Sequence, residues 1–209
     1  MVFRVESISD DDLDKLLDNF IIELEPFFGI TWKWNRPSIF LVEDRNTIDL
    51  IKGNKTPSWL VGWSSGKDIF ILSKKSFEKE SCHEYSYEEY SMLLKHELVH
   101  CFCNVVFPWM QKPLWLMEGI AVYLSGQYKT KEKSEKFEEF LGYVDKGGER
   151  LYAESGAAVD ILVDNFGWEN VVELIRGLKN VGSSEDFEVL FQGIFGFEAC
   201  YEEFNRRLK

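Results

Sequence analysis

The sequence lacks the features that mark several common protein classes. Basic residues are in the minority, with 24 Lys and Arg against 36 Asp and Glu and a net charge of −12. This balance argues against nucleic acid or an anionic membrane surface as a partner, because both attract basic proteins. No apolar run approaches the roughly 18 residues that a membrane-spanning helix needs. We therefore expect no nucleic-acid partner and no membrane association.

Signals for export and for a disulfide framework are also missing. The first residues, MVFRVESISDDDLDKLL, have neither the basic start nor the unbroken apolar segment of a secretory signal. The chain has four cysteines, whose spacing indicates no pairing: Cys82, Cys101, Cys103 and Cys200. Unpaired cysteines are typical of reducing compartments. We expect a cytoplasmic protein with free thiols.

What remains is a globular composition. Of the 209 residues, 45% are hydrophobic and 29% are charged, and neither an internal repeat nor a low-complexity linker interrupts them. We predict a single domain over residues 1–209, with an α/β N-terminal lobe at 1–85 and a helical lobe at 86–209.

The N-terminal lobe alternates between helical and strand-like patterns. Apolar residues recur at helical spacing in SDDDLDKLLDNFIIELEPFFG, behind a Ser9 cap and as far as Pro26. Three strand-like segments follow: SIFLVE (38–43), SWLVGW (58–63) and DIFILS (68–73). The last two flank a turn at 64–67 and are typical of a hairpin. We predict one helix and a small mixed sheet.

The second lobe has helical patterns almost throughout. A helix is predicted from a capping box at Ser86 and Glu89 to the residue before Pro108, and another from Pro113 to Gly126. The charged segment 129–150 is interpreted as a solvated helix and a Gly-Gly turn. Three or four more helices are predicted from the segments 152–167, 168–180, 183–195 and 197–209. The fold class is therefore α+β.

Two of the three histidines lie in the stretch LLKHELVHCF, residues 93–102. On an α-helix a four-residue step turns the chain by about 40° and rises about 6 Å. His96 and His100 therefore project from one face, as two imidazoles that share a zinc ion must. Glu97 lies about 100° round the helix from His96 and can reach a metal-bound water, which is the chemistry of the His-Glu-x-x-His motif. Two histidines with satisfied partners in the core are the alternative.

A catalytic zinc site needs a third protein ligand and an open fourth position. The metzincin continuation, Gly and then His, is excluded because Cys103 and Val106 occupy those positions. Cys103 itself would lie about 10 Å from His96 along the helix axis, so a buried core cysteine is the better interpretation.

The remaining candidate for the third ligand is Glu118, in WLMEGIAVY. Seventeen residues, 101–117, separate it from His100, which is enough for the helix to end and a second helix to return beside it. A carboxylate in such an apolar helix is costly unless it is paired or bound to a metal. An exposed glutamate on a polar helix side is the alternative.

These motifs together resemble a known family. HELVH followed by LWLMEGIAVYL is similar to the His-Glu-x-x-His and Trp-Leu-x-Glu-Gly-x-Ala-x-Tyr signature of gluzincin metallopeptidases, the peptidase MA-like and aminopeptidase N-like catalytic domains, here in minigluzincin size. The resemblance implies a zincin-like fold and one Zn²⁺ per chain. It implies that His96, His100 and Glu118 are the zinc ligands and that Glu97 is the general base.

The resemblance continues into LYAESGAAVDILVDNFG. It implies that Tyr152 donates a hydrogen bond to the oxyanion that develops during hydrolysis. Tyr123 is the alternative, but five helical residues place it about 140° round from Glu118. A tyrosine that merely packs at a helix start is the structural alternative for Tyr152.

The sequence also departs from the family. The aminopeptidase Gly-x-Met-Glu-Asn signature is missing, because LVGWSSGKDIFILS contains no glutamate. The aspartate found four residues after the third ligand in thermolysin is replaced by Val122, so Asn104 and the backbone are the candidates for orienting the histidines. The segment 67–73, KDIFILS, is the candidate edge strand for a peptide substrate. Cys82 and His83 are interpreted as surface residues rather than a second metal site.

The sequence therefore predicts a zinc-dependent metallopeptidase that acts on a peptide or protein substrate. Glu97 would activate a zinc-bound water and Tyr152 would steady the oxyanion. The missing clamp for a free amino terminus favours an endopeptidase over an aminopeptidase. The alternatives are a catalytically silent zincin-fold binding or regulatory protein and a zinc hydrolase of a non-peptide substrate.

Overall fold

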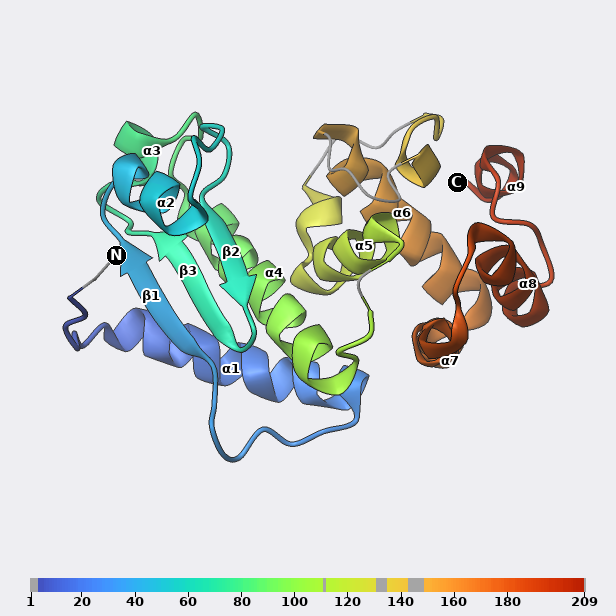
Figure 1. Cartoon of the computed structure of the whole chain (residues 1–209), viewed down its shortest axis with the longest axis horizontal. Coiled ribbons are helices and arrows are strands. Elements are labelled where there is room, and N and C mark those ends of the chain that lie inside the picture. Colours follow the sequence, from blue (N-terminus) through green and yellow to red (C-terminus); the bar gives the residue numbers. More distant parts are fainter. Residues whose placement is uncertain (1–3, 111, 131–134, 143–148, 209) are drawn as a thin grey trace.

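The computed structural model describes residues 4–110, 112–130, 135–142 and 149–208. They form an α+β structure in which a small sheet with flanking helices is followed by a mainly helical part (Figure 1). The predicted fold class of α+β is thus confirmed. None of the helices formed by the described residues is both long enough and apolar enough to cross a membrane.

Helix α1, Asp11–Phe28, forms as predicted but with different ends. Its N-cap is Asp10, whose carboxylate accepts a hydrogen bond from the Leu13 N–H, so the Ser9 cap was wrong by one residue. Pro26 does not end the helix. It lies in the last turn, and the helix ends at Gly29, which has a left-handed backbone and donates its N–H to Glu25.

The sheet has the strand order β1-β3-β2, with β1 at Ser38–Val42, β2 at Gly62–Ser65 and β3 at Asp68–Leu72. β1 runs parallel to β3 and β2 runs antiparallel to it, so the predicted mixed sheet and hairpin are confirmed. The hairpin loop is only Gly66 and Lys67, and residues 58–61 precede the strand rather than belong to it. A glycine with positive φ suits such a two-residue loop.

The strand order corrects one expectation. β3, which contains most of KDIFILS, is the central strand and both of its edges are paired. It therefore has no free edge for a substrate. β2 is an edge strand instead.

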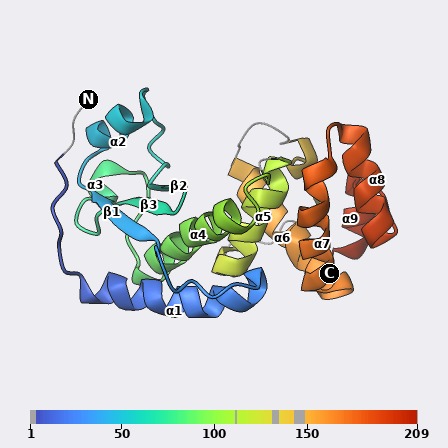
Figure 2. The ribbon, with the colours of Figure 1, turned by 60° about the horizontal axis from the view of Figure 1, so that its bottom comes forward.

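The two faces of the sheet are covered by different helices. Figure 2 shows α1 and α4 (Tyr87–Val106) on one side and α2 (Arg45–Lys52) on the other. On the α2 side the rings of Phe40, Phe70 and Trp63 stack across the three strands, and the Lys52 ammonium lies over Trp63. Side chains alternate along a strand, so the buried Ile69 and Ile71 face α1 and α4.

Two short helices were not predicted: α2 and α3, Phe77–Glu80. A signal for α2 was present. Asp44 caps its start by accepting the Thr47 N–H, and Gly53 ends it with a left-handed backbone.

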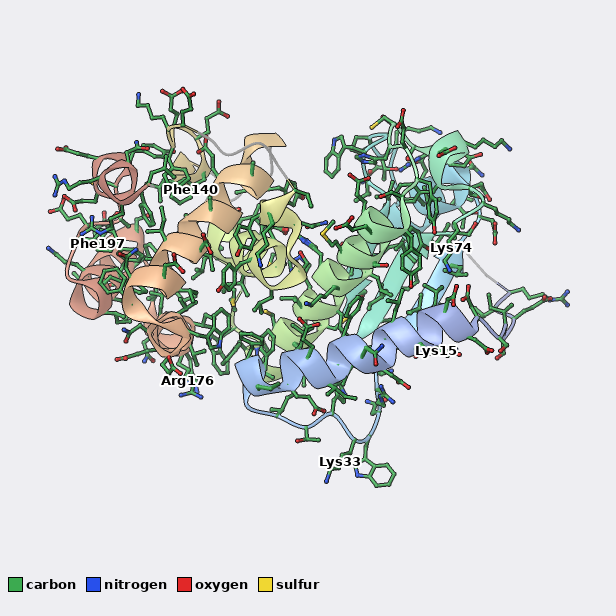
Figure 3. All side chains as sticks on the ribbon, turned by 180° about the vertical axis from the view of Figure 1, so that it is seen from behind. Lys15, Lys33, Lys74, Phe140, Arg176 and Phe197 are labelled. Atoms are coloured by element: carbon green, nitrogen blue, oxygen red, sulfur yellow. The ribbon has the colours of Figure 1, made fainter. Side chains whose placement is uncertain are left out.

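The helical part begins with α5, Leu114–Ser125, which is followed by the 3₁₀ helices η1, Gln127–Lys129, and η2, Phe140–Gly142. Of the three or four C-terminal helices that were predicted, the described residues form four: α6 (Glu149–Phe166), α7 (Trp168–Gly177), α8 (Ser184–Phe195) and α9 (Tyr201–Arg207). The 3₁₀ helix η3 (Leu178–Asn180) follows α7. In Figure 3, Phe140 and Phe197 lie among these helices, whereas Lys15 and Lys74 mark the sheet side.

The charged segment is not the solvated helix that was predicted. Between residues 135 and 142, Phe137 and Phe140 are fully buried against α9, and the η2 turn is the only helix among these residues. Glu154 of α6 fixes this segment, because its buried carboxylate accepts the backbone N–H groups of Glu138, Glu139 and Phe140. The predicted Gly-Gly turn lies outside the described residues.

Candidate metal centre

Helix α4 supplies the first half of the site. It lies between the sheet and α5 (Figure 1), so its middle turns are buried on all sides. His96, Glu97 and His100 are only 5%, 6% and 9% exposed. Three ionisable groups in the apolar centre of one helix are costly unless each has a partner. The helix therefore concentrates polar groups where the fold otherwise buries apolar ones.

Helix α5 supplies the second half and is held against α6 by a close backbone approach. At Gly119 a Cβ atom would lie 2.6 Å from the Ser155 carbonyl oxygen of α6 and 2.9 Å from Val159 Cγ2. Only glycine fits such a contact. The contact fixes the neighbouring Glu118, which is 9% exposed and directed at α4.

The structure brings the three predicted ligands together. The Nε2 atoms of His96 and His100 are 3.1 Å apart, and Glu118 Oε2 lies 3.3 Å and 3.4 Å from them. Ligand atoms bonded at about 2.0–2.1 Å to a tetrahedral zinc are about 3.3–3.4 Å from one another. The triangle thus has the size of one face of a zinc tetrahedron. His, His and Glu are also a donor set that catalytic zinc sites use.

The electrostatics of this triangle favour a cation at its centre. Burial lowers the pKa of His100, but the adjacent Glu118 carboxylate and Glu97 raise it more strongly, to about 9. Burial raises the pKa of Glu118, but the His100 and His96 rings hold it well below its ordinary value. Two imidazole lone pairs and a carboxylate at these distances repel one another unless a proton or a metal ion lies between them.

Glu97 lies beside the triangle and not in it. Burial raises the pKa of its carboxyl group, the His96 and His100 rings lower it, and the Glu118 charge raises it again, with a net upward shift. A carboxylate with a raised pKa is a stronger proton acceptor. The first residue of β2 packs over it, since a Cβ at Gly62 would be 3.6 Å from Glu97 Cγ.

A cleft of about 690 Å³ opens at this point, bordered by residues of α4, of the segment that leads into β2, of η1 and of α6. Its lining includes His96, Glu97 and Tyr152, together with the segment Trp59–Gly62 that leads into β2. The described residues hold one group of three or more His, Cys, Asp and Glu side chains close enough to share a metal ion, namely His96, His100 and Glu118. It lies at the edge of this cleft.

The two candidate tyrosines occupy different environments. The ring centroid of Tyr152 is 6.2 Å from that of His96, and its side chain lines the cleft. Burial and the charges of Glu118 and Glu97 raise the pKa of Tyr152, so its hydroxyl keeps its proton. Tyr123 instead stacks between Tyr128 and Trp168, away from the cleft.

The side chain that contacts the outer ring nitrogen of His96 was missed in the sequence. The Nδ1 of His96 lies 2.9 Å from the Oε1 of Gln127. Asn104, the side chain that the sequence offered for this role, donates to the Gly66 carbonyl instead, so that expectation was wrong. His100 Nδ1 is buried and has no hydrogen-bond partner in the described structure.

The other residues considered in the sequence lie outside the triangle. Cys103 is a buried free thiol, as is Cys101. Cys82 and His83 are exposed at the far end of the cleft, where His83 Nε2 lies 3.1 Å from the Trp59 carbonyl oxygen.

Comparison with family models and with curated proteins gave no match for this sequence.

Proposed function

We propose that this protein is a zinc-dependent metallopeptidase of the gluzincin type, with a zincin-like fold and one Zn²⁺ per chain. The observation that carries the proposal is the convergence of His96, His100 and Glu118 on a triangle of zinc-ligand size. The resemblance of HELVH and LWLMEGIAVYL to the gluzincin signature supports the same assignment.

The chemistry follows from the roles of the neighbouring side chains. Zinc bound by the three ligands would supply Lewis acidity, which polarises a carbonyl group and makes water more acidic. Glu97 is buried beside the ligands, and we assign it the role of accepting the proton of the attacking water and passing it to the departing amine. Tyr152 keeps its hydroxyl proton and is the candidate donor to the oxyanion.

The edge of the sheet favours a peptide as substrate. β2 is an edge strand, and its first residue packs over Glu97 at the cleft. An extended peptide that adds to this edge would lie beside the base and the ligands, held by main-chain hydrogen bonds. No glutamate occurs in the segment 60–73, where aminopeptidases hold a free amino terminus, so an endopeptidase is favoured.

The test combines metal analysis with a base variant. Wild type and Glu97→Gln are each assayed for bound zinc and for cleavage of a pool of unstructured peptides. We expect about one zinc per chain in both proteins, and cleavage that is slower by about 10²–10⁴-fold in the variant. Glu88→Gln makes the same charge change on an exposed turn of α4 and should leave cleavage unchanged.

Two outcomes would contradict the proposal in different ways. Zinc binding without cleavage of any peptide would favour a silent binding protein or a hydrolase of another bond. If Glu97→Gln cleaved peptides as fast as wild type, the proposed metal site would be unaffected, but the role of Glu97 as general base would be contradicted.

A further inference from the structure

We propose that Gln127 is the positioning residue of the metal centre, because it fixes the ring orientation and the proton of His96. This inference rests on the proposed zinc site and adds a residue to it. Its basis is the 2.9 Å contact between His96 Nδ1 and Gln127 Oε1. His96 Nε2 faces the other ligands, so Nδ1 carries the proton and donates it to the amide oxygen.

The two imidazoles differ in this respect. His96 has an outer hydrogen bond, whereas His100 Nδ1 is buried without a partner in the described structure. Metal-bound histidines usually donate their second N–H to an oxygen, which sets the tautomer and the ring plane. In the described part of this site Gln127 alone performs that task for the pair, so its loss has no substitute there.

Local structure holds Gln127 rigidly. Gly126 ends α5 with φ of 84°, a left-handed backbone that redirects the chain into η1. The Gln127 N–H contacts Ser125 Oγ, and its carbonyl oxygen accepts hydrogen bonds from the backbone and the hydroxyl of Thr130. These contacts fix the backbone of Gln127, so only its side-chain torsions remain to be ordered by the bond to His96.

The same segment therefore delivers two parts of the site. The Glu118 side chain extends from α5 toward His96 as a candidate ligand. Gln127 lies nine residues later, just after the end of α5, and its side chain contacts the other nitrogen of the same histidine. Any displacement of α5 moves both. Gln127 also lines the cleft, so it belongs to the wall that borders the metal.

The experiment measures zinc affinity, which does not depend on any assay of cleavage. Wild type, Gln127→Met and Gln127→Glu are titrated with zinc in competition with a chromophoric chelator. Methionine keeps the length of the side chain but has no strong acceptor, so we expect affinity to fall by about 10–100-fold. Glutamate keeps an acceptor oxygen and should restore affinity to at least the wild-type value.

Controls separate positioning from general damage. Gln192→Met changes an exposed glutamine on α8, and Asn104→Ala removes the amide that bonds Gly66; neither should alter zinc affinity. Visible absorption after cobalt substitution provides a spectroscopic signature of ligand geometry. It should change in Gln127→Met and recover in Gln127→Glu.

The outcomes distinguish this role from the proposed function. If wild type binds zinc and Gln127→Met binds it equally well with an unchanged cobalt spectrum, the role of Gln127 is overturned and the metal site stands. If wild type binds no zinc, the metal site fails, and the positioning role fails with it. A folded Gln127→Glu with the weak affinity of Gln127→Met would also overturn the proposal.

Discussion

The sheet side and the helical side of the molecule are each stabilised by a different kind of interaction. On the sheet side a polar network fixes the loops, centred on Arg45 of α2, whose guanidinium donates to the carbonyl oxygens of Pro57, Ser58, Leu60 and Glu80. On the helical side an aromatic cluster fills the interior, and α5 packs on α6 through Gly119. The candidate metal site takes ligands from both halves, α4 and α5.

This difference explains what each half contributes. Hydrogen bonds to carbonyl groups set the path of the irregular segment 57–60, in which Trp59 and Leu60 line the cleft. Close packing of apolar surfaces sets the distance between helices, and that distance places Glu118 against the histidines. The sheet side thus shapes the cleft wall beside Glu97, and the helical side places Glu118 against the two histidines.

The largest effect on this comparison is expected from Phe140→Ala. The Phe140 ring is fully buried, 5.1 Å from Phe204 and 5.2 Å from Trp115. Its loss should destabilise the protein by about 3–5 kcal/mol, as measured by chemical denaturation. Val189→Ala on the exposed face of α8 should change stability little. If Phe140→Ala and Val189→Ala changed the free energy of unfolding equally, the aromatic cluster would not be what stabilises the helical side.

A smaller effect is expected from Gly119→Ala. The added methyl would collide with the Ser155 carbonyl oxygen and force α5 from α6, at a cost of about 1–3 kcal/mol. Because Glu118 is the preceding residue, zinc affinity should fall as well. Gly193→Ala is the matched control, since nothing lies within 4 Å of a Cβ there. A stable Gly119→Ala with unchanged zinc binding would show that this contact does not place the ligand.

On the sheet side, Arg45→Lys should act mainly on substrate binding. A lysine cannot replace the planar fork that holds Ser58, Leu60 and Glu80 together. We expect a loss of about 1–2 kcal/mol and a raised KM with little change in kcat or zinc affinity. Arg36→Lys alters an exposed pair with Asp18 and should be neutral. If Arg45→Lys changed only the zinc affinity and left KM unchanged, the assignment of the sheet side to substrate binding would be contradicted.

The smallest effect is expected at acidic pH, where the stabilisation contributed by Asp49 is lost. Hydrogen bonds from Lys55 and Thr56 lower the pKa of Asp49 to about 2. The unfolded chain binds this proton with a pKa of about 3.9, so the stabilisation is present above that pH and is lost as pH falls toward 2. Wild type should therefore lose its stability advantage over Asp49→Asn across this window in denaturation measurements. A constant difference between pH 5 and pH 2 would contradict this assignment.

The candidate ligands were predictable because the signal is local or nearly so. His96 and His100 share a face through helical periodicity alone, and Glu118 stands out as an acid in an apolar helix. Gln127 was not predictable, because no pattern links it to His96. Its place depends on the left-handed turn at Gly126 and on the packing of α5 against α4.

The same distinction applies to the fold. The helices α4–α9 follow from caps, periodicity and breakers, whereas the order of the strands follows from pairing between distant segments. The segment 135–142 was misread because its many charges concealed Phe137 and Phe140, which are buried only once Trp115 of α5 and Phe204 of α9 pack against them. The short helix α2 has a capping residue, Asp44, and a terminating glycine, Gly53. Its eight residues are too few for the helical periodicity of apolar residues to be recognised in the sequence.

The sequence by itself determined which residues are candidates for the chemistry: two imidazoles one turn apart, a carboxylate between them and an acid in the next helix. Tertiary structure decided the distances among them, the edge strand beside Glu97 and the partner of His96. The reason is that helical spacing is a property of neighbouring residues, whereas a strand edge and a contact between helices exist only after distant segments have packed.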